Sequence, residues 1–193
     1  MRVYLVELLG TFGLTLAVAL SLAGGLAVAT PIVAALTLGL FVYTIGPISG
    51  SHLNPAVTIG LWSVQQIKST KAVGYILAQL IGALVALYLA SIFAPAPDLV
   101  VSNAVLVGLA ELIGAFFFVF GITAVVTGKV PQSLSGVVVG GSLLLGITLA
   151  SVISNGVLNP AVALGIGSFN VMYLVGPILG AVLGAWTFRF VSK

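Results

Sequence analysis

Six long apolar runs follow one another along this chain, and they limit its possible folds more than any other feature. Each run is close to the length that crosses a bilayer, because roughly 30 Å of hydrocarbon takes about 20 helical residues. Backbone in lipid must pair its own polar groups, so we expect all six runs to be helices. The runs cover residues 3–27, 31–48, 72–94, 104–126, 134–153 and 171–191.

The composition also points to a membrane protein, because a soluble chain could not cover its surface with so few charges. Hydrophobic residues make up 61% of the chain and charged residues 5%, against about a quarter in soluble domains. The chain has no cysteine and one histidine, which excludes disulfides, thiol chemistry and a His-rich metal site. Its basic residues are scattered and form no stripe, so we expect no nucleic-acid partner. We also expect no metal and no cofactor.

Residues 1–30 loosely resemble a signal peptide, with Arg2 before an apolar stretch and Ala-Val-Ala near its end. The apolar stretch is longer than the core of a typical signal peptide and contains Glu7. We therefore expect a retained first span, with cleavage as the alternative.

Two apolar segments, residues 55–64 and 160–169, are too short to span, and both begin within an Asn-Pro-Ala motif. At 1.5 Å per helical residue, about ten residues reach roughly half of the membrane. Asn is a preferred N-cap and Pro suits the first helical position, so each motif predicts a helix start.

The charges allow the topology to be tested. If the N-terminus is cytoplasmic and neither short segment spans, every basic residue falls on the cytoplasmic side and Asp98 lies outside. This arrangement obeys the positive-inside rule. We therefore expect a multi-pass integral protein of the plasma membrane with both termini in the cytoplasm. The basic residues are Arg2, Lys68, Lys71, Lys129, Arg189 and Lys193.

The chain contains an internal repeat. "VELLGTFGL" matches "AELIGAFFF", and "YILAQLIGALVA" matches "YLVGPILGAVLG". Each half has three spans, an odd number, so the second half enters the membrane from the opposite face and the repeat is inverted. We expect one transmembrane domain with halves of residues 1–97 and 98–193. The match pairs Glu7 with Glu111, Asn54 with Asn159 and Gly82 with Gly180.

Inverted halves bring the starts of both short helices together near the membrane midplane. Each start carries the positive end of a helix dipole, roughly half an elementary charge. Two such ends repel cations, while the amides of Asn54 and Asn159 are free to donate hydrogen bonds to a passing oxygen. An ordinary helix cap in a loop is the alternative for one motif, but two motifs at matched positions weigh against it.

These residues resemble the aquaporin (major intrinsic protein) family. "SGSHLNPAVTIG" and "LNPAV" look like its two signatures, and "VELLGTF", "AELIGAFFFVFG" and "YLVGPILGAVLGA" resemble three of its helices. The resemblance implies six transmembrane helices with two re-entrant half-helices, a passive channel for water or small uncharged solutes, and a homotetramer with one pore per subunit. It assigns the pore motifs to Asn54, Pro55, Ala56, Asn159, Pro160 and Ala161.

Three ionisable residues are expected to support the half-helices. Glu7 and Glu111 lie about one turn into spans, where a carboxylate needs partners. We expect each to accept hydrogen bonds from backbone N–H groups before a half-helix, a structural role that the resemblance also implies. For Glu7, snorkelling to the surface is the alternative. His52 either lines the cytoplasmic vestibule or bonds to the loop backbone, and we favour the second.

Small and hydroxylated residues in the spans are interpreted as packing features. Small residues four apart allow close helix contacts, within the fold or between protomers. They are Gly74, Ala78, Gly82 and Ala86, and Gly176, Gly180 and Gly184. We expect the hydroxyls of Thr11, Thr15 and Thr148 to bond to backbone carbonyls.

The chain departs from the family at the outer selectivity filter. Most members carry an arginine directly after the second Asn-Pro-Ala, where this chain has Val162. The other matching positions are Ala34, Ile147 and Gly156. The resemblance therefore implies an uncharged, wider, apolar filter, unless neighbouring side chains close it. Glycerol, urea-like solutes, metalloid hydroxides, ammonia and gases become candidates besides water, and proton exclusion loses one positive charge.

Two other classes of function are alternatives to a channel. Inverted repeats with broken helices also build ion- or proton-coupled transporters, which need a titratable group in the pathway. The candidates here are Glu7, Glu111 and His52, which are better explained as scaffold. An enzyme is not expected, because one histidine without cysteine or a nearby acidic pair assembles no catalytic set.

Overall fold

The computed structural model describes residues 1–24 and 27–193, and the regular structure in those residues is entirely helical, as expected. Five helices are long and apolar enough to cross a membrane. They are α1 (Arg2–Ala23), α5 (Ser69–Phe93), α6 (Val105–Val126), α7 (Ser135–Ala150) with the preceding 3-10 turn η1 (Gln132–Leu134), and α9 (Val171–Val191). The shorter helices are α2 (Thr30–Thr44), α3 (Gly46–Ser49), α4 (Pro55–Ser63) and α8 (Pro160–Gly165).

The second predicted span is wrong at its end. The apolar run over residues 31–48 was expected to form one helix, but α2 stops at Thr44 and the separate turn α3 begins at Gly46. Pro47 explains the break, because it has no N–H to continue the helical hydrogen bonds and its ring crowds the preceding turn. In the first run, α1 ends at Ala23, and the prediction that it reaches residue 27 falls partly on residues 25–26, outside the described part.

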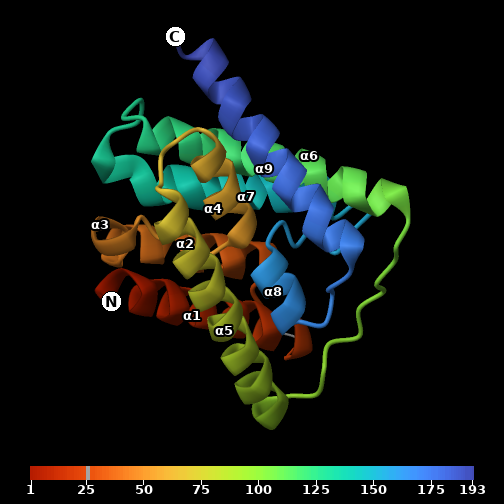
Figure 1. Cartoon of the computed structure of the whole chain (residues 1–193). Helices are drawn as coiled ribbons and strands as arrows, with labels where there is room; N and C mark the ends of the chain where they lie inside the picture. Colours follow the sequence, from red (N-terminus) through yellow and green to blue (C-terminus); the bar gives the residue numbers. More distant parts are fainter. Residues whose placement is uncertain (25–26) are drawn as a thin grey trace.

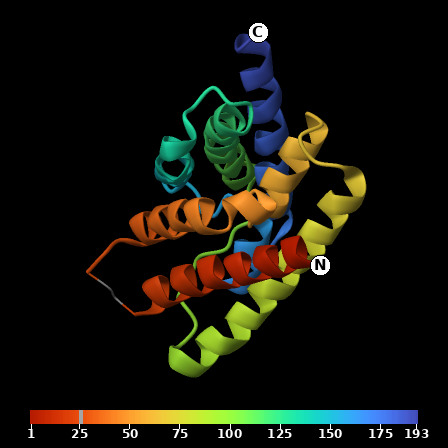
Figure 2. The same cartoon turned by 90° about the vertical axis from the view of Figure 1, so that its left-hand side faces the viewer.

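The two halves of the chain pack in corresponding ways. Helix α1 lies along α5 as α6 lies along α9, and α2 packs against α7 where the halves meet. The short helices exchange partners, because α4 packs against α9 and α8 against α5 (Figure 1). Figure 2 shows α1 and α2 side by side in the first half. This exchange is what a two-fold axis between the halves produces, and it is the inverted repeat expected from the sequence.

Glycines in the spans allow backbones to touch within the fold. A Cβ at Gly82 of α5 would collide with the carbonyl oxygen of Leu8 in α1, and one at Gly180 of α9 with that of Leu112 in α6. The two contacts are equivalent in the two halves. At these positions the small residues therefore serve packing within the fold. This is one of the two alternatives given above, the other being packing between protomers.

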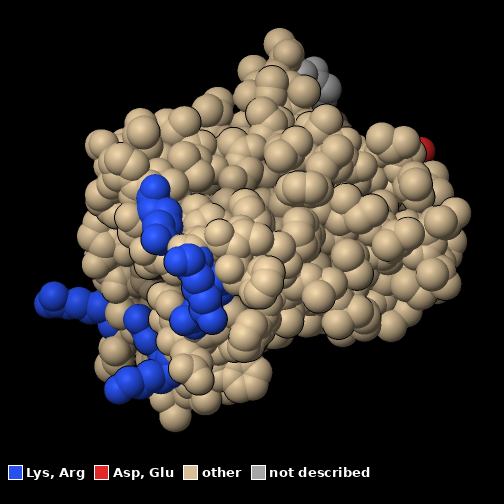
Figure 3. Space-filling model, turned by 90° about the horizontal axis from the view of Figure 1, so that it is seen from above, with Lys and Arg blue, Asp and Glu red and all other residues tan. Residues whose placement is uncertain are grey.

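The outer surface fits a membrane. Large apolar side chains are exposed along the helices, among them Leu36, Tyr88 and Phe190. The Lys and Arg side chains gather at one end of the molecule and an acidic side chain lies at the opposite end (Figure 3). The basic end carries the start of α1, the start of α5 and the ends of α6 and α9. We call this end the basic side, and the opposite end, crossed by the linker of residues 94–104, the linker side.

Candidate functional site

The two Asn-Pro-Ala motifs start the two short helices. Asn54 is the N-cap of α4, and its Oδ1 accepts from the N–H groups of Ala56 at 2.8 Å and Val57 at 3.4 Å. Asn159 caps α8 in the same way, accepting from Ala161 at 3.0 Å and Val162 at 3.3 Å. Pro55 and Pro160 are the first residues of these helices, where a missing N–H costs no hydrogen bond.

The side-chain amides of the two asparagines bind across the axis between the halves. Asn54 Nδ2 donates to the carbonyl oxygen of Leu158 at 2.9 Å, and Asn159 Nδ2 donates to that of Leu53 at 2.9 Å. The expectation that both amides remain free is therefore only half right. An amide nitrogen has two N–H groups, so each asparagine keeps one for a molecule in the pathway.

The half-helices differ in length, and one is shorter than expected. Helix α4 has nine residues, but α8 has only six, from Pro160 to Gly165, where about ten had been predicted. Beyond α8 the backbone turns through Gly167, whose φ of +80° suits glycine. Because α8 is so short, its dipole contributes less than that of α4.

Each buried glutamate holds the loop that leads to a half-helix. Glu7 accepts from the N–H groups of His52 at 2.9 Å and Leu53 at 2.8 Å. Glu111 accepts from those of Val157 at 2.9 Å and Leu158 at 2.6 Å. Both carboxylates are fully buried, which contradicts the snorkelling alternative for Glu7. The geometry matches the structural role expected for both.

The loops held by the glutamates have strained backbones at matched positions. Leu53 has φ of +48° and Leu158 +56°, a left-handed conformation that costs a branched residue energy. Ser49 Oγ donates to Glu7 at 2.6 Å and Ser154 Oγ to Glu111 at 2.8 Å. The serine pair was missed in the sequence, although its members precede Asn54 and Asn159 by the same number of residues.

In the first half, a polar network joins Glu7 to Gln79, Thr58 and His52. Gln79 Nε2 donates to Glu7 at 2.8 Å and to Thr58 Oγ1 at 3.1 Å. Thr58 Oγ1 in turn lies 3.1 Å from His52 Nδ1. Gln79 and Thr58 were not predicted from the sequence. The signal for Gln79 was an amide in the middle of a long apolar span, which is costly without a partner.

His52 bonds to a side chain and faces the cavity, so the interpretation that its ring bonds to the loop backbone is wrong. Its main-chain N–H, not its ring, binds Glu7. Thr58 Oγ1 donates its single proton to the carbonyl oxygen of Asn54 at 3.0 Å, so we assign the ring proton to Nδ1, which donates to Thr58. This leaves Nε2 of His52 as a hydrogen-bond acceptor.

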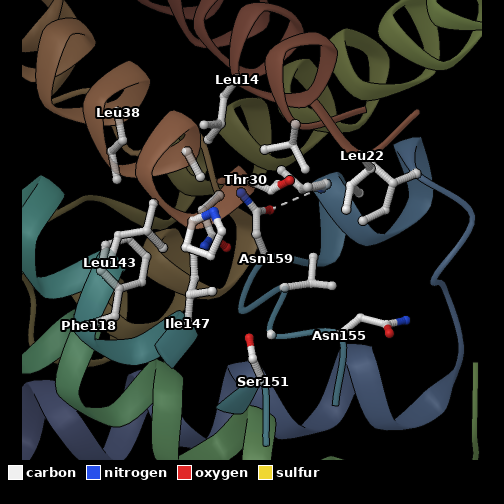
Figure 4. A pocket seen from close by; sticks show the side chains of 18 of the residues that line it. Leu14, Leu22, Thr30, Leu38, Phe118, Leu143, Ile147, Ser151, Asn155 and Asn159 are labelled. Carbon is white, nitrogen blue, oxygen red and sulfur yellow. Dashed lines mark hydrogen bonds between the residues drawn. The ribbon is translucent and has the colours of Figure 1, made fainter. Parts of the chain in front are cut away.

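A cavity of about 350 Å³ runs from the linker side to the two asparagines (Figure 4). All four predicted filter positions line it, and so do Asn54, Asn159 and His52. These predicted positions are Ala34, Ile147, Gly156 and Val162. In Figure 4, Leu38, Leu143, Phe118 and Ile147 lie to the left of Asn159, with Ser151 below it and Asn155 to its right. The wall is mainly apolar, with a few polar groups where the two halves meet.

Of three threonines in the spans, one forms the expected hydrogen bond and two do not. Thr148 Oγ1 donates to the carbonyl oxygen of Leu144 at 2.7 Å, as expected. Thr11 and Thr15 are fully buried, and their hydroxyls find no hydrogen-bond partner in the part of the chain that the structure describes. The expectation for these two is wrong.

Comparisons with known proteins agree on one family. The sequence model described as "Major intrinsic protein" matches residues 2–188. The chain is 34% identical to "Aquaporin AqpM" of Methanothermobacter marburgensis, over 91% of this chain and 77% of that protein. It is 32% identical to "Nodulin-26" of Glycine max, over 83% of this chain and 64% of that protein. The fold is similar to that of the aquaglyceroporin from Plasmodium falciparum, with a TM-score of 0.76, 23% identity and coverage of 100% of this chain and 95% of that chain.

Proposed function

This chain belongs to the major intrinsic protein family and is a passive membrane channel for water or other small uncharged molecules, and we propose that it admits solutes of glycerol's size as well as water. The observation that supports this proposal is the cavity wall at the four filter positions. Ala34, Ile147, Gly156 and Val162 line the cavity there, and none has a charged or aromatic side chain. An arginine at position 162 would put a charged, planar group into this section, whereas Val162 leaves it uncharged.

The cavity suits molecules with hydroxyl groups on a carbon frame. Leu14, Leu38 and Phe118 offer apolar surface to the carbon atoms. At the inner end, the free N–H of each motif asparagine donates to solute oxygens, and His52 Nε2 accepts from a solute hydroxyl. A solute with hydrogen-bond donors and acceptors therefore replaces the hydrogen bonds that it lost to water with bonds to these polar groups. Its carbon atoms contact the apolar part of the cavity wall.

Ions lack compensation along the same wall. Among the residues that the structure describes, none of those that line the cavity is a Lys, Arg, Asp or Glu. An ion that loses its water in an apolar section loses far more solvation free energy than the polar groups of the wall can supply. The N-terminus of α4 adds positive potential where the pathway meets Asn54. We propose that these terms together exclude ions, as the paired motifs led us to expect.

Coupled transport and catalysis are not proposed. Neither Glu7 nor Glu111 lines the cavity, and each carboxylate already accepts hydrogen bonds from loop N–H groups. Members of this family are channels rather than enzymes. Solute uptake should therefore be independent of an imposed proton gradient.

The assembly and orientation are further parts of the proposal. We propose one transmembrane domain with halves of residues 1–97 and 98–193, a homotetramer, and a plasma-membrane location with both termini in the cytoplasm. The gathering of Lys and Arg at one end supports the orientation through the positive-inside rule. The tetramer rests on the family resemblance.

Stopped-flow light scattering on proteoliposomes tests the choice of solute. Sucrose, which does not permeate, gives the rate of water efflux, and a glycerol gradient gives shrinkage followed by re-swelling. We expect fast shrinkage in both and fast re-swelling in glycerol. Fast shrinkage without re-swelling would restrict the channel to water and overturn the proposal.

The Val162→Arg variant sharpens this test. We expect glycerol re-swelling to slow by at least about tenfold, equivalent to roughly 1.4 kcal/mol of barrier, with water flux retained. Val162→Met adds length without charge. It therefore shows whether a slower glycerol flux in Val162→Arg comes from the size of the side chain or from its charge. Unchanged glycerol flux in Val162→Arg would show that position 162 does not border the pathway.

A further inference from the structure

The cavity lies on one side of the two-fold axis that relates the halves. Both members of each equivalent pair nearest the axis line it. These pairs are Leu14 with Phe118, Leu38 with Leu143, His52 with Val157, and Asn54 with Asn159. The reciprocal bonds from Asn54 to Leu158 and from Asn159 to Leu53 place the axis between the two motifs. The cavity therefore reaches the centre of the molecule from the linker side.

For pairs farther from the axis, the member on the linker side lines the cavity, and its equivalent on the basic side does not. Ile147 of α7 lines it, but its equivalent Val42 of α2 does not. Val162 of α8 lines it, but its equivalent Val57 of α4 does not. The helix correspondence is supported by α2 and α7 themselves, because a Cβ at Gly140 would lie 2.6 Å from the carbonyl oxygen of Ala35, and these two residues are equivalent to each other.

Applying the two-fold axis to the filter positions defines a second ring. We call Ala34, Ile147, Gly156 and Val162 the linker-side ring. Its equivalents, in the same order, are Val139, Val42, Ser51 and Val57, which we call the basic-side ring. All four members of the basic-side ring are buried, and none lines the cavity.

The basic-side ring carries the larger side chains. Val139 stands where the other ring has Ala34, and Ser51 stands where it has Gly156. Val57 and Val162 are the same residue, and Val42 is only one methylene smaller than Ile147. Because the loops follow the same course at Ser51 and Gly156, we expect the larger side chains of the basic-side ring to leave less room than those of the linker-side ring.

Ser51 provides a second, independent observation. Its hydroxyl is buried and has no hydrogen-bond partner in the described chain, an arrangement that costs free energy unless something binds there. Its φ of +51° matches the +61° of Gly156, so the two loops follow the same course. A serine kept in a strained conformation with an unpaired hydroxyl is explained if the hydroxyl binds a molecule in the pathway.

We propose that the basic-side ring, rather than the linker-side ring, is the constriction that sets the size limit of this channel, with Ser51 Oγ as its hydrogen-bonding group. The inference rests on the proposed function, because it assumes a pathway through the centre of the subunit. It assigns the discrimination between small and large polyols to Val42, Val57 and Val139 on the basic side of the asparagines.

The test compares glycerol and the four-carbon polyol erythritol in proteoliposomes. Val139→Ala combined with Ser51→Gly copies the linker-side residues into the basic-side ring, and glycine suits the backbone at position 51. We expect erythritol re-swelling to rise by about tenfold over the wild type, a barrier change of roughly 1.4 kcal/mol. No rise, in a variant with normal water flux, would overturn the inference.

A matched pair of single variants locates the limit without relying on the double variant. Val57→Ala and Val162→Ala remove the same atoms at equivalent positions on the two half-helices. We expect the rise in erythritol flux to be greater for Val57→Ala. A greater rise for Val162→Ala would return the size limit to the linker-side ring. Gly141→Ala, on an exposed part of α7 with no atom near its added Cβ, is the control for handling and incorporation.

The outcomes separate this inference from the proposed function. If the wild type passes water but no glycerol, the proposed function fails. The inference still stands in that case if Val139→Ala with Ser51→Gly admits glycerol. If the wild type passes glycerol and no basic-side variant changes erythritol flux, only the inference fails.

Discussion

Glu111 shows how a single buried side chain supports this site. Its two oxygens accept from Ser154 Oγ and from the N–H groups of Val157 and Leu158, which approach α8 in a strained backbone. Without the carboxylate, these loop N–H groups would be left unpaired in a buried region, where each costs about 1–3 kcal/mol. Glu7 does the same for α4 through His52 and Leu53.

Replacing Glu111 by Gln should destabilise the protein. The amide has one acceptor oxygen, and its NH₂ group would face an N–H or hydroxyl donor that the carboxylate now satisfies. We expect a loss of about 1–3 kcal/mol, seen as a lower midpoint of thermal unfolding in detergent. Asp98→Asn, which removes an exposed carboxylate on the linker, is the matched control. Equal midpoints for the two variants would contradict the role assigned to Glu111.

At the scale of elements, backbone contact between helices holds the two half-helices in register. Helix α5 meets α1 at Gly82, and α9 meets α6 at Gly180, without side chains between the backbones. Helices α5 and α9 in turn support α8 and α4. A displacement of α5 therefore changes the position of α8 and of Val162 on it.

Gly82→Ala tests this packing. The added methyl group would collide with the carbonyl oxygen of Leu8 and lie 3.0 Å from the N–H nitrogen of Phe12. Backbone cannot yield as a side chain does, so we expect a loss of about 1–3 kcal/mol in stability and slower solute flux. Gly141→Ala, with open space around its Cβ, should be neutral or slightly stabilising. Thermal unfolding and proteoliposome flux measure both, and equal behaviour would refute the close contact.

At the scale of the whole molecule, charge is separated along the axis that would cross the membrane. Lys and Arg gather on the basic side, while the linker of residues 94–104 runs across the other side with Asp98 exposed. By the positive-inside rule, this separation supports the proposed orientation, in which the linker lies outside the cell.

Cysteine labelling tests the orientation directly, because the natural chain has no cysteine. Ala96→Cys introduces a thiol on the linker, and Gln132→Cys introduces one between α6 and α7, both at exposed positions. We expect a membrane-impermeant maleimide to label Ala96→Cys in intact cells and Gln132→Cys only after permeabilisation. The reverse pattern would invert the proposed topology, and the cysteine-free parent reports background labelling.

Much of the fold could be predicted because its signals are local. Long apolar runs, Asn-Pro-Ala helix starts and the pairing of Glu7 with Glu111 depend on residues whose preferences act over a few positions. The sequence alone therefore determined most of the spans and the inverted repeat, whereas the filter positions, which the family resemblance implies, stay a prediction. It erred at Pro47, where the apolar run continued but the helix could not, and at the length of α8.

What only the tertiary structure decided concerns contacts between segments far apart in the chain. The bonds from Asn54 to Leu158 and from Asn159 to Leu53, the link from Gln79 through Thr58 to His52, and the end of the cavity at the axis have no local signature. A hydropathy pattern reports which residues prefer lipid or burial, but not which buried groups meet. Partner choice depends on the three-dimensional packing of whole helices, and that packing determines where the pathway is wide and where it closes.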